Sequence, residues 1–116
     1  MSETIPDELI NDILQLLSRV KETGKIRRGT NEVTKCIERG RAQLVLIGGD
    51  VTPPEITRHL PILAKEKNVA YLAIPSSTQL GTAAGLEVAA ASVAIQEAGS
   101  MDSDLKSIVE RVRQFN

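Results

Sequence analysis

The residues best suited to chemistry lie in one short segment, 25–39 (KIRRGTNEVTKCIER). Asn31, Lys35 and Arg39 follow one another at intervals of four, so a helix would place them on one face, with Glu32 beside them in its first turn. Lysine and arginine neutralise phosphates, an amide both donates and accepts hydrogen bonds, and a carboxylate only accepts them. Because a carboxylate repels phosphates, its place in a cationic face indicates contact with exposed base edges. The segment therefore predicts a surface for nucleic acid.

The residues at the start of this helix also favour the binding of nucleic acid. Thr30 is predicted as the N-cap, and Gly29 before it leaves the free N–H groups of the first turn open to a phosphate oxygen. The major groove of an ordinary A-form RNA helix is too deep and narrow for side chains to read, so the expected target is opened, bent or mispaired RNA. The competing explanation is a solvated helix in which Glu32 complements the helix dipole and pairs with Lys35, and the pattern leaves both open.

The charges of the chain are divided unevenly. Its 14 basic and 15 acidic residues leave a formal net charge of −1, which by itself gives no reason to expect a nucleic-acid partner. Residues 19–41, however, hold eight basic and three acidic residues, so this segment carries +5 and the remainder −6. A domain polarised in this way can present a local cationic face and stay in solution.

Few residues offer other kinds of chemistry. One cysteine and one histidine cannot supply an internal disulfide or a metal-ligand cluster, so no cofactor or metal is expected. Cys36 is expected to pack in the core, and His59 to pair with Glu55 on a helix surface rather than to act as a catalytic base. Residues 48–50 (GGD) match no phosphate-loop motif and predict a tight exit from a strand. The chain is not expected to be an enzyme.

The remaining bulk properties narrow the class of protein further. With one tyrosine, one phenylalanine and no tryptophan, the chain is a poor candidate for binding single strands by stacking bases on aromatic rings. No apolar run is long enough for a membrane span, and the first ten residues lack the pattern of a signal peptide. We therefore expect a cytoplasmic monomer, with residues 1–116 forming one domain.

Helices and strands are expected to alternate along the chain. Hydrophobic spacing and capping signals predict helices over 7–22, from Thr30 to just before Gly40, over 52–68, from Ser76 to Gly85 and from 102 onward. Strands are predicted over 43–47 and 69–74, with 25–28 as a short connection or edge strand. Residues 89–95 favour a helix by their alanines and a strand by their length and position, and we choose the strand. These elements predict an α/β fold with a sheet covered on both faces.

The run from Arg27 to Ile95, beginning RRGTNEVTK, closely resembles the archaeal large-subunit ribosomal protein seven-Ae family, and the similarity extends over about 25–99. That family binds the kink-turn, a bent RNA internal loop with tandem sheared G·A pairs. The resemblance implies a three-layer α-β-α sandwich with a central mixed four-stranded sheet. It also implies an RNA-binding surface made of Lys25, Arg28, Gly29, Thr30, Asn31, Glu32, Lys35, Arg39, Asp50, Ile56, Leu86, Glu87 and Val88.

Within this surface the resemblance implies distinct roles. The family motif Gly-x-Asn-Glu-x-x-Lys, which begins at Gly29, would insert at the G·A pairs, and Arg39 would contact a phosphate. The apolar members of 86–88 would cover an extruded nucleotide. One departure is Ser77, because family members usually carry a lysine there, and its absence predicts the loss of one phosphate contact.

The same resemblance implies the partners. They are kink-turns in ribosomal RNA and in box C/D and H/ACA guide RNAs, with ribonuclease P RNA as a further candidate, together with other ribonucleoprotein subunits. The alternative is a structural ribosomal protein or protein-interaction module that has no preference for kink-turns.

Overall fold

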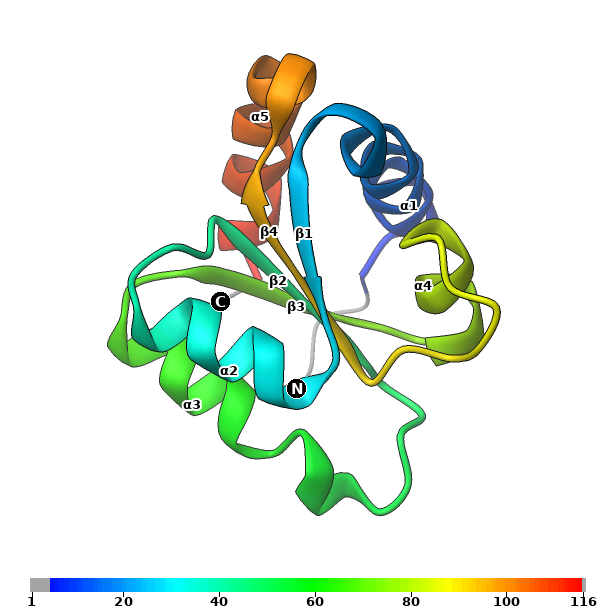
Figure 1. Cartoon of the computed structure of the whole chain (residues 1–116), viewed down its shortest axis with the longest axis vertical. Helices are drawn as coiled ribbons and strands as arrows, with labels where there is room; N and C mark the ends of the chain where they lie inside the picture. The colour runs from blue at the N-terminus through cyan, green and yellow to red at the C-terminus, as the bar shows by residue number, and fades with distance from the viewer. Residues whose placement is uncertain (1–4, 116) are drawn as a thin grey trace.

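The computed structural model describes residues 5–115 and contains helices and short strands in alternation (Figure 1). The α-helices are α1 (Asp7–Thr23), α2 (Thr30–Glu38), α3 (His59–Glu66), α4 (Ser77–Ala83) and α5 (Asp102–Arg113). The strands are β1 (Lys25–Arg28), β2 (Leu44–Gly48), β3 (Ala70–Ile74) and β4 (Ser92–Glu97). Two 3₁₀ helices, η1 (Pro54–Ile56) and η2 (Gly99–Met101), precede α3 and α5.

The four strands form one mixed sheet in the order β1-β4-β2-β3. Strands β2 and β3 are parallel, whereas β4 runs antiparallel to both of its neighbours, β1 and β2. Strand β2 is buried along its whole length, and β1 and β3 lie at the two edges. The expected mixed four-stranded sheet is confirmed.

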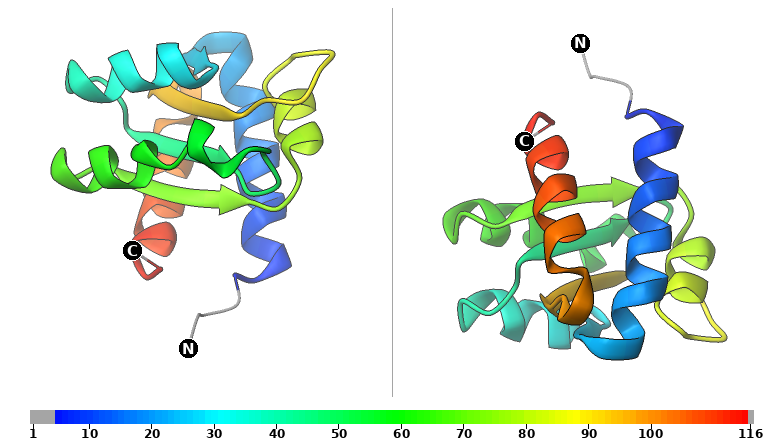
Figure 2. Two further views of the ribbon diagram at one scale, coloured as in Figure 1. Left: turned by 90° about the horizontal axis from the view of Figure 1, so that it is seen from below. Right: turned by 90° about the horizontal axis from the view of Figure 1, so that it is seen from above.

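Helices cover both faces of the sheet, so the three-layer α-β-α sandwich is also confirmed. Figure 2 shows α2 and α3 on one face and α1 and α5 on the other. Alternation along β2 explains why both faces are apolar, because Leu44 and Leu46 join the core under α1, α4 and α5, whereas Val45 and Ile47 join the core under α2 and α3.

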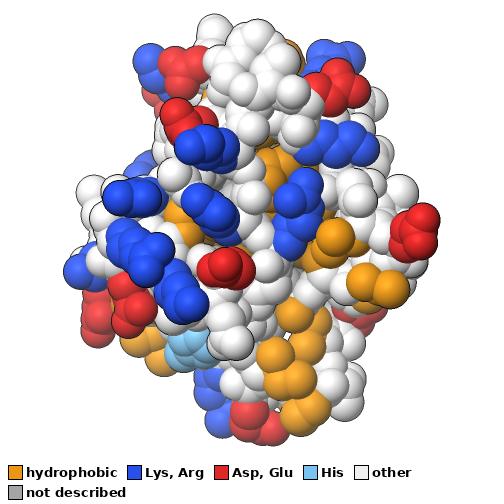
Figure 3. All heavy atoms as spheres, in the orientation of Figure 1, with side chains coloured by type: hydrophobic (Ala, Val, Ile, Leu, Met, Phe, Trp, Pro, Cys, Tyr) orange, Lys and Arg blue, Asp and Glu red, His pale blue; other side chains and the backbone are white. Residues whose placement is uncertain are grey.

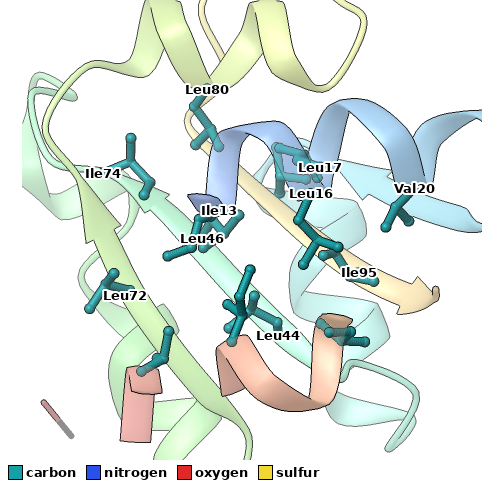
Figure 4. Close-up of a cluster of buried hydrophobic side chains, with 14 of the residues drawn as sticks. Ile13, Leu16, Leu17, Val20, Leu44, Leu46, Leu72, Ile74, Leu80 and Ile95 are labelled. Carbon is teal, nitrogen blue, oxygen red and sulfur yellow. The ribbon is translucent and has the colours of Figure 1, made fainter. Parts of the chain in front are cut away.

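The larger core depends on the apolar stripe of α1. Ile13, Leu16, Leu17 and Val20 recur at helical spacing and pack against the sheet (Figure 4). Three of them are 0% exposed and Leu16 is 3% exposed. Burying each such side chain stabilises the fold by about 1.5–3 kcal/mol, so this stripe fixes α1 against the sheet.

The predicted helix over 52–68 is wrong in its first half. Only η1 forms there, and α3 begins at His59. The N–H of Thr57 donates to the carbonyl of Pro54 at 3.2 Å, and that of Leu60 to the carbonyl of Thr57 at 3.0 Å, which is the three-residue spacing of a tight 3₁₀ turn. Ile56 lies at the end of η1 and is 42% exposed.

Other boundaries agree more closely with the sequence. Residues 25–28 form an edge strand, and Gly24 ends α1. The hydroxyl of Ser76 accepts from the N–H of Gln79 at 3.2 Å and so caps α4 as predicted. The strand predicted over 89–95 is confirmed as β4, although it begins three residues later, at Ser92. Across residues 5–115, none of the helices has the length and hydropathy needed to cross a membrane.

Candidate nucleic-acid interface

The start of α2 differs in one respect from its prediction. Gly29 is the N-cap, with φ 90° and ψ 152°, and Thr30 is already the first helical residue. The expectation that Thr30 caps the helix is therefore wrong. Its carbonyl instead accepts a hydrogen bond from the hydroxyl of Thr34 at 2.7 Å. A Cβ on Gly29 would meet no atom within 4 Å, so the positive φ is what favours glycine at this position.

The first turn of α2 leaves its N–H groups accessible. No side chain among residues 5–115 caps this helix end. Because Gly29 has no side chain, nothing of its own blocks the approach of an anion to these donors. The geometry expected for a phosphate oxygen at this turn is therefore present, with Gly29 rather than Thr30 as the cap.

Four polar side chains project from the same helix into solvent. These exposed side chains are Asn31, Glu32, Lys35 and Arg39. The apolar residues of α2 are buried against the sheet, so the opposite side of the helix, which carries the polar residues, faces solvent. In the described part of the chain, no ion pair or side-chain hydrogen bond engages any of the four. The pairing of Glu32 with Lys35, which the competing explanation requires, does not form.

A hydrogen-bonded chain that the sequence did not predict joins α3 to this helix. Nε2 of His59 lies 2.8 Å from the hydroxyl of Thr34. Since that hydroxyl donates to the carbonyl of Thr30, it can accept from His59. The predicted surface pair of His59 with Glu55 is wrong, because Glu55 pairs with Arg58 at 3.0 Å. The interrupted helix explains this, since Glu55 lies in η1 and His59 begins α3.

The basic residues of β1 are held by their neighbours. Nε of Arg28 donates to the carbonyl of Ala84 at 2.6 Å, and Nε of Arg27 donates to Oε1 of Gln96 at 2.9 Å. Lys25 forms an exposed ion pair with Glu97 at 3.5 Å. Arg28 therefore ties the edge strand to the end of α4, a role that its spacing in the sequence could not reveal.

Cys36 behaves as a packing residue. It is 4% exposed in the core beneath α2 and α3. Burial raises the pKa of its thiol above the ordinary value, although Arg27, Arg41 and Arg39 partly oppose that shift. A thiol with a raised pKa is a poor nucleophile at neutral pH, in keeping with the expected core role.

Basic side chains form a band on the face of the molecule that carries α2 and β1. Figure 3 shows a band of Lys and Arg side chains over α2 and β1, with single carboxylates among them. Hydrophobic side chains border this band in two places. One group lies toward α4, and the other lies toward the loop after β2. Two of the large apolar side chains exposed in these loops are Ile56, at 42%, and Val88, at 68%.

The loop after α4 presents residues 86–88 in different ways. Glu87 and Val88 are exposed, whereas Leu86 is half-buried against the core formed with α1, α4 and α5. The N–H of Leu86 donates to the carbonyl of Gly81 at 2.8 Å, which holds the loop on α4. Val88 and Glu87 are therefore available to a ligand, and Leu86 mainly supports the loop.

Asp50 has a structural contact that the sequence did not reveal. Its Oδ1 accepts from the backbone N–H of Ser77 at 2.9 Å, across the exit of β2. Hydrogen bonds donated by the hydroxyl and the N–H of Ser77 lower the pKa of Asp50 below its ordinary value of 3.8. The N–H of Gly49 donates to the carbonyl of Ile74 at 2.8 Å, so residues 48–50 form the tight strand exit that was predicted.

This contact predicts a pH-dependent contribution to stability. Because folding lowers the pKa of Asp50, the stabilisation is complete above about pH 5 and is lost as the pH falls below about 4, through the folded-state value. Thermal unfolding of wild type and Asp50→Asn should therefore differ most at neutral pH and converge in acid. A difference in Tm that stays constant from pH 7 to pH 2 would contradict the role assigned to the carboxylate.

Among residues 5–115, the predicted RNA-contacting residues form neither a metal site nor part of the apolar hollow at the β3 edge. In the chain between residues 5 and 115, no three His, Cys, Asp or Glu side chains come together as metal ligands. A hollow of about 640 Å³ lies at the β3 edge, lined by apolar residues such as Tyr71 and Phe115, and none of the predicted RNA-contacting residues lines it. The predicted residues instead lie on α2, β1 and two loops beside them.

Comparison with known proteins agrees with this architecture. A sequence profile of the ribosomal protein L7Ae/L30e/S12e/Gadd45 family matches residues 11–104. The structure is similar to that of the 15.5 kD RNA binding protein of Giardia lamblia, with a TM-score of 0.89 and 32% sequence identity. The match covers 97% of this chain and 93% of that chain. The resemblance noted in the sequence is thereby confirmed, and the chain belongs to the ribosomal protein L7Ae/L30e/S12e/Gadd45 family.

Proposed function

We propose that this protein binds kink-turn RNA through the exposed face of α2 and the loops beside it. The observation that carries the proposal is the first turn of α2, where the amide of Asn31 and the carboxylate of Glu32 are exposed and unpaired within the described chain. Lys35 and Arg39 continue the same face. The structural neighbour from Giardia lamblia, an RNA binding protein by its title, supports RNA as the ligand class.

The chemistry divides between base edges and phosphates. Asn31 would donate to and accept from exposed purine edges, and Glu32 would accept from exocyclic amines or a guanine imino group. Lys35, Arg39 and the open N–H groups of the first turn would hold phosphates of the folded-back strand. Val88, which is 68% exposed, would cover an extruded nucleotide. Since Watson–Crick pairs do not expose these edges to a helix, sheared G·A pairs fit the surface better.

The mechanism is selection of a minor RNA conformation. A kink-turn that interconverts between extended and bent forms is shifted toward the bent form by a protein that binds that form more tightly. A shift from 1:99 to 99:1 requires about 10⁴-fold tighter binding to the bent form. The protein supplies contacts and charge neutralisation, and it need perform no chemical step of its own.

The finer proposals concern the RNA particles. We infer an archaeal-type protein of the cytoplasm that acts as a monomer on kink-turns of ribosomal RNA and of box C/D and H/ACA guide RNAs, with ribonuclease P RNA as a further candidate. By stabilising the bent RNA, it would nucleate assembly with other ribonucleoprotein subunits, which carry out any chemistry.

A gel shift with two RNAs tests the proposal. One RNA carries a kink-turn, and the other has its sheared G·A pairs replaced by Watson–Crick pairs at equal length. The proposal predicts binding that is at least tenfold tighter to the kink-turn, since one good base contact is worth about 1–3 kcal/mol of discrimination. Equal affinity for the two RNAs would favour a structural ribosomal protein or interaction module instead.

Ser77 predicts a specific change in salt dependence. A lysine there would add a cation at the start of α4, so Ser77→Lys is expected to tighten RNA binding and to steepen the plot of log Kd against log salt by roughly one unit. Ser107→Lys, which adds the same charge to an exposed position of α5, across the sheet from α2, is the matched control. Identical slopes for Ser77→Lys and wild type would contradict the expectation that position 77 lies beside a phosphate.

A further inference from the structure

Two cationic side chains converge beside Gly85, outside the face of α2. A Cβ built on Gly85 would lie 3.9 Å from Nζ of Lys21 and 3.8 Å from Nη2 of Arg28, so both charged groups approach one point. Lys21 comes from the last turn of α1, Arg28 from the end of β1, and Gly85 from the turn after α4. The three segments are far apart in the sequence, and only the fold brings them together.

The two cations repel each other, and no acidic side chain of the described residues pairs with either of them. In the part of the chain that the structure describes, neither Lys21 nor Arg28 forms an ion pair. Glu22 and Glu87 are exposed neighbours along the chain and pair with neither cation. Because both groups lie within 4 Å of one point, they are less than about 8 Å apart and repel each other even in water, so an anion between them would be favoured.

One of the two cations is already fixed. Nε of Arg28 donates to the carbonyl of Ala84 at 2.6 Å, which orients the guanidinium and leaves its terminal nitrogens for another acceptor. Lys21 is exposed and can adjust to a ligand. A preoriented arginine with a mobile lysine suits a phosphate oxygen, because the arginine loses little further conformational freedom on binding.

Further basic residues lie beside Lys21 and Arg28. A hollow of about 310 Å³ lies next to it, and four of its lining residues are basic: Lys21, Lys25, Arg27 and Arg28. This hollow lies along β1, whose outer edge has no strand partner in the sheet formed by residues 5–115. Lysine on an edge strand also protects against strand pairing between molecules, and this is the competing explanation.

We propose that Lys21 and Arg28 form a phosphate-binding position that holds a phosphodiester of the bound RNA, beyond the contacts made by α2. The inference rests on the proposed function, because it assumes that RNA lies on this side of the molecule. It adds α1 to the RNA-binding surface and gives Lys21 a role that neither the motif nor the spacing of the sequence indicates. Arg28 acts in it both as an anchor for the loop and as a phosphate ligand.

The test compares two single charge removals on one helix. Residues 19 and 21 are about 200° apart around α1, and Arg19 lines a groove toward α5 rather than the side of Arg28. Lys21→Ala is expected to weaken binding to kink-turn RNA about fivefold to tenfold in low salt and to reduce the log–log salt slope by about 0.7–0.9. Arg19→Ala should change the affinity by less than about twofold and leave the salt slope unchanged, and Lys21→Arg should restore both the affinity and the slope.

A second readout locates the phosphate. Methylphosphonates, which lack the negative charge, are placed one at a time along the RNA backbone. One position is expected to weaken binding of wild type and to have no further effect on Lys21→Ala. Equal losses for Lys21→Ala and Arg19→Ala, or no phosphate whose effect depends on Lys21, would overturn the inference.

The outcomes separate this inference from the proposed function. The Lys21 comparison can be made on either RNA, so a wild-type protein that fails to prefer the kink-turn would refute the proposed function alone. A wild-type protein that binds neither RNA would refute both. Normal kink-turn preference with an unaltered Lys21→Ala would leave the proposed function standing and refute only the phosphate position.

Discussion

Glu32→Gln is expected to reduce the preference for kink-turn RNA over its Watson–Crick counterpart by roughly tenfold to a hundredfold, the equivalent of about 1–3 kcal/mol. Glutamine keeps the shape of the side chain and loses the charge and one acceptor function. Because Glu32 is exposed and unpaired within the described residues, this substitution should leave the Tm almost unchanged. Fluorescence anisotropy titrations with both RNAs at one salt concentration measure the effect.

Two further variants of α2 separate the roles of its residues. Glu38→Gln removes the same charge from an exposed position near the end of the helix and should leave the preference intact. Lys35→Ala should weaken binding to both RNAs by a similar factor, because a phosphate contact carries no sequence information. If Glu32→Gln and Lys35→Ala behave alike, the division between base reading and phosphate binding is wrong.

Gly81→Ala is expected to destabilise the fold by about 1–3 kcal/mol and to weaken kink-turn binding about tenfold. A Cβ on Gly81 would collide with the carbonyl oxygen of Val88 and would lie 3.0 Å from the backbone nitrogen of Ala90. Gly81 is buried in α4, so the loop that carries Glu87 and Val88 would have to move away. Urea unfolding and RNA titration measure the two effects on the same protein samples.

Two control variants separate the effect of Gly81→Ala on the unfolding free energy from its effect on RNA affinity. Val88→Ala trims a side chain that is 68% exposed and should weaken RNA binding without a change in unfolding free energy. Thr78→Ala alters an exposed position of the same helix and should change neither quantity. RNA affinity that survives Gly81→Ala while stability falls would show that the loop after α4 takes no part in binding.

Residues with a strong local pattern were predicted well from the sequence. The stripe of α1, the buried run of β2 and the polar face of α2 follow from periodicity, because a helix or strand with one apolar side can bury it in few ways. The exposure of Asn31, Glu32, Lys35 and Arg39 follows from the burial of the opposite side of α2. The resemblance supplied the sandwich and the meaning of the motif.

The remaining features depend on contacts between distant segments. Nothing local indicates that Arg28 donates to Ala84, that His59 contacts Thr34 or that Lys21 meets Arg28 beside Gly85. The error at 52–58 has a local cause, because Thr-Pro-Pro-Glu suits a helix start and equally a single 3₁₀ turn. Thr30 was misplaced by one position, since a glycine with positive φ can end the preceding strand and cap the helix together.

Fluorescence energy transfer across a kink-turn RNA tests the central claim most directly. A donor and an acceptor are attached to the two arms, and the protein is titrated in buffer without divalent cations. Wild type is expected to raise the transfer efficiency to a plateau for the kink-turn and to leave it unchanged for the RNA in which Watson–Crick pairs replace the sheared pairs. Saturated binding of the kink-turn with its arms still extended would contradict the claim that α2 holds a bent, mispaired RNA.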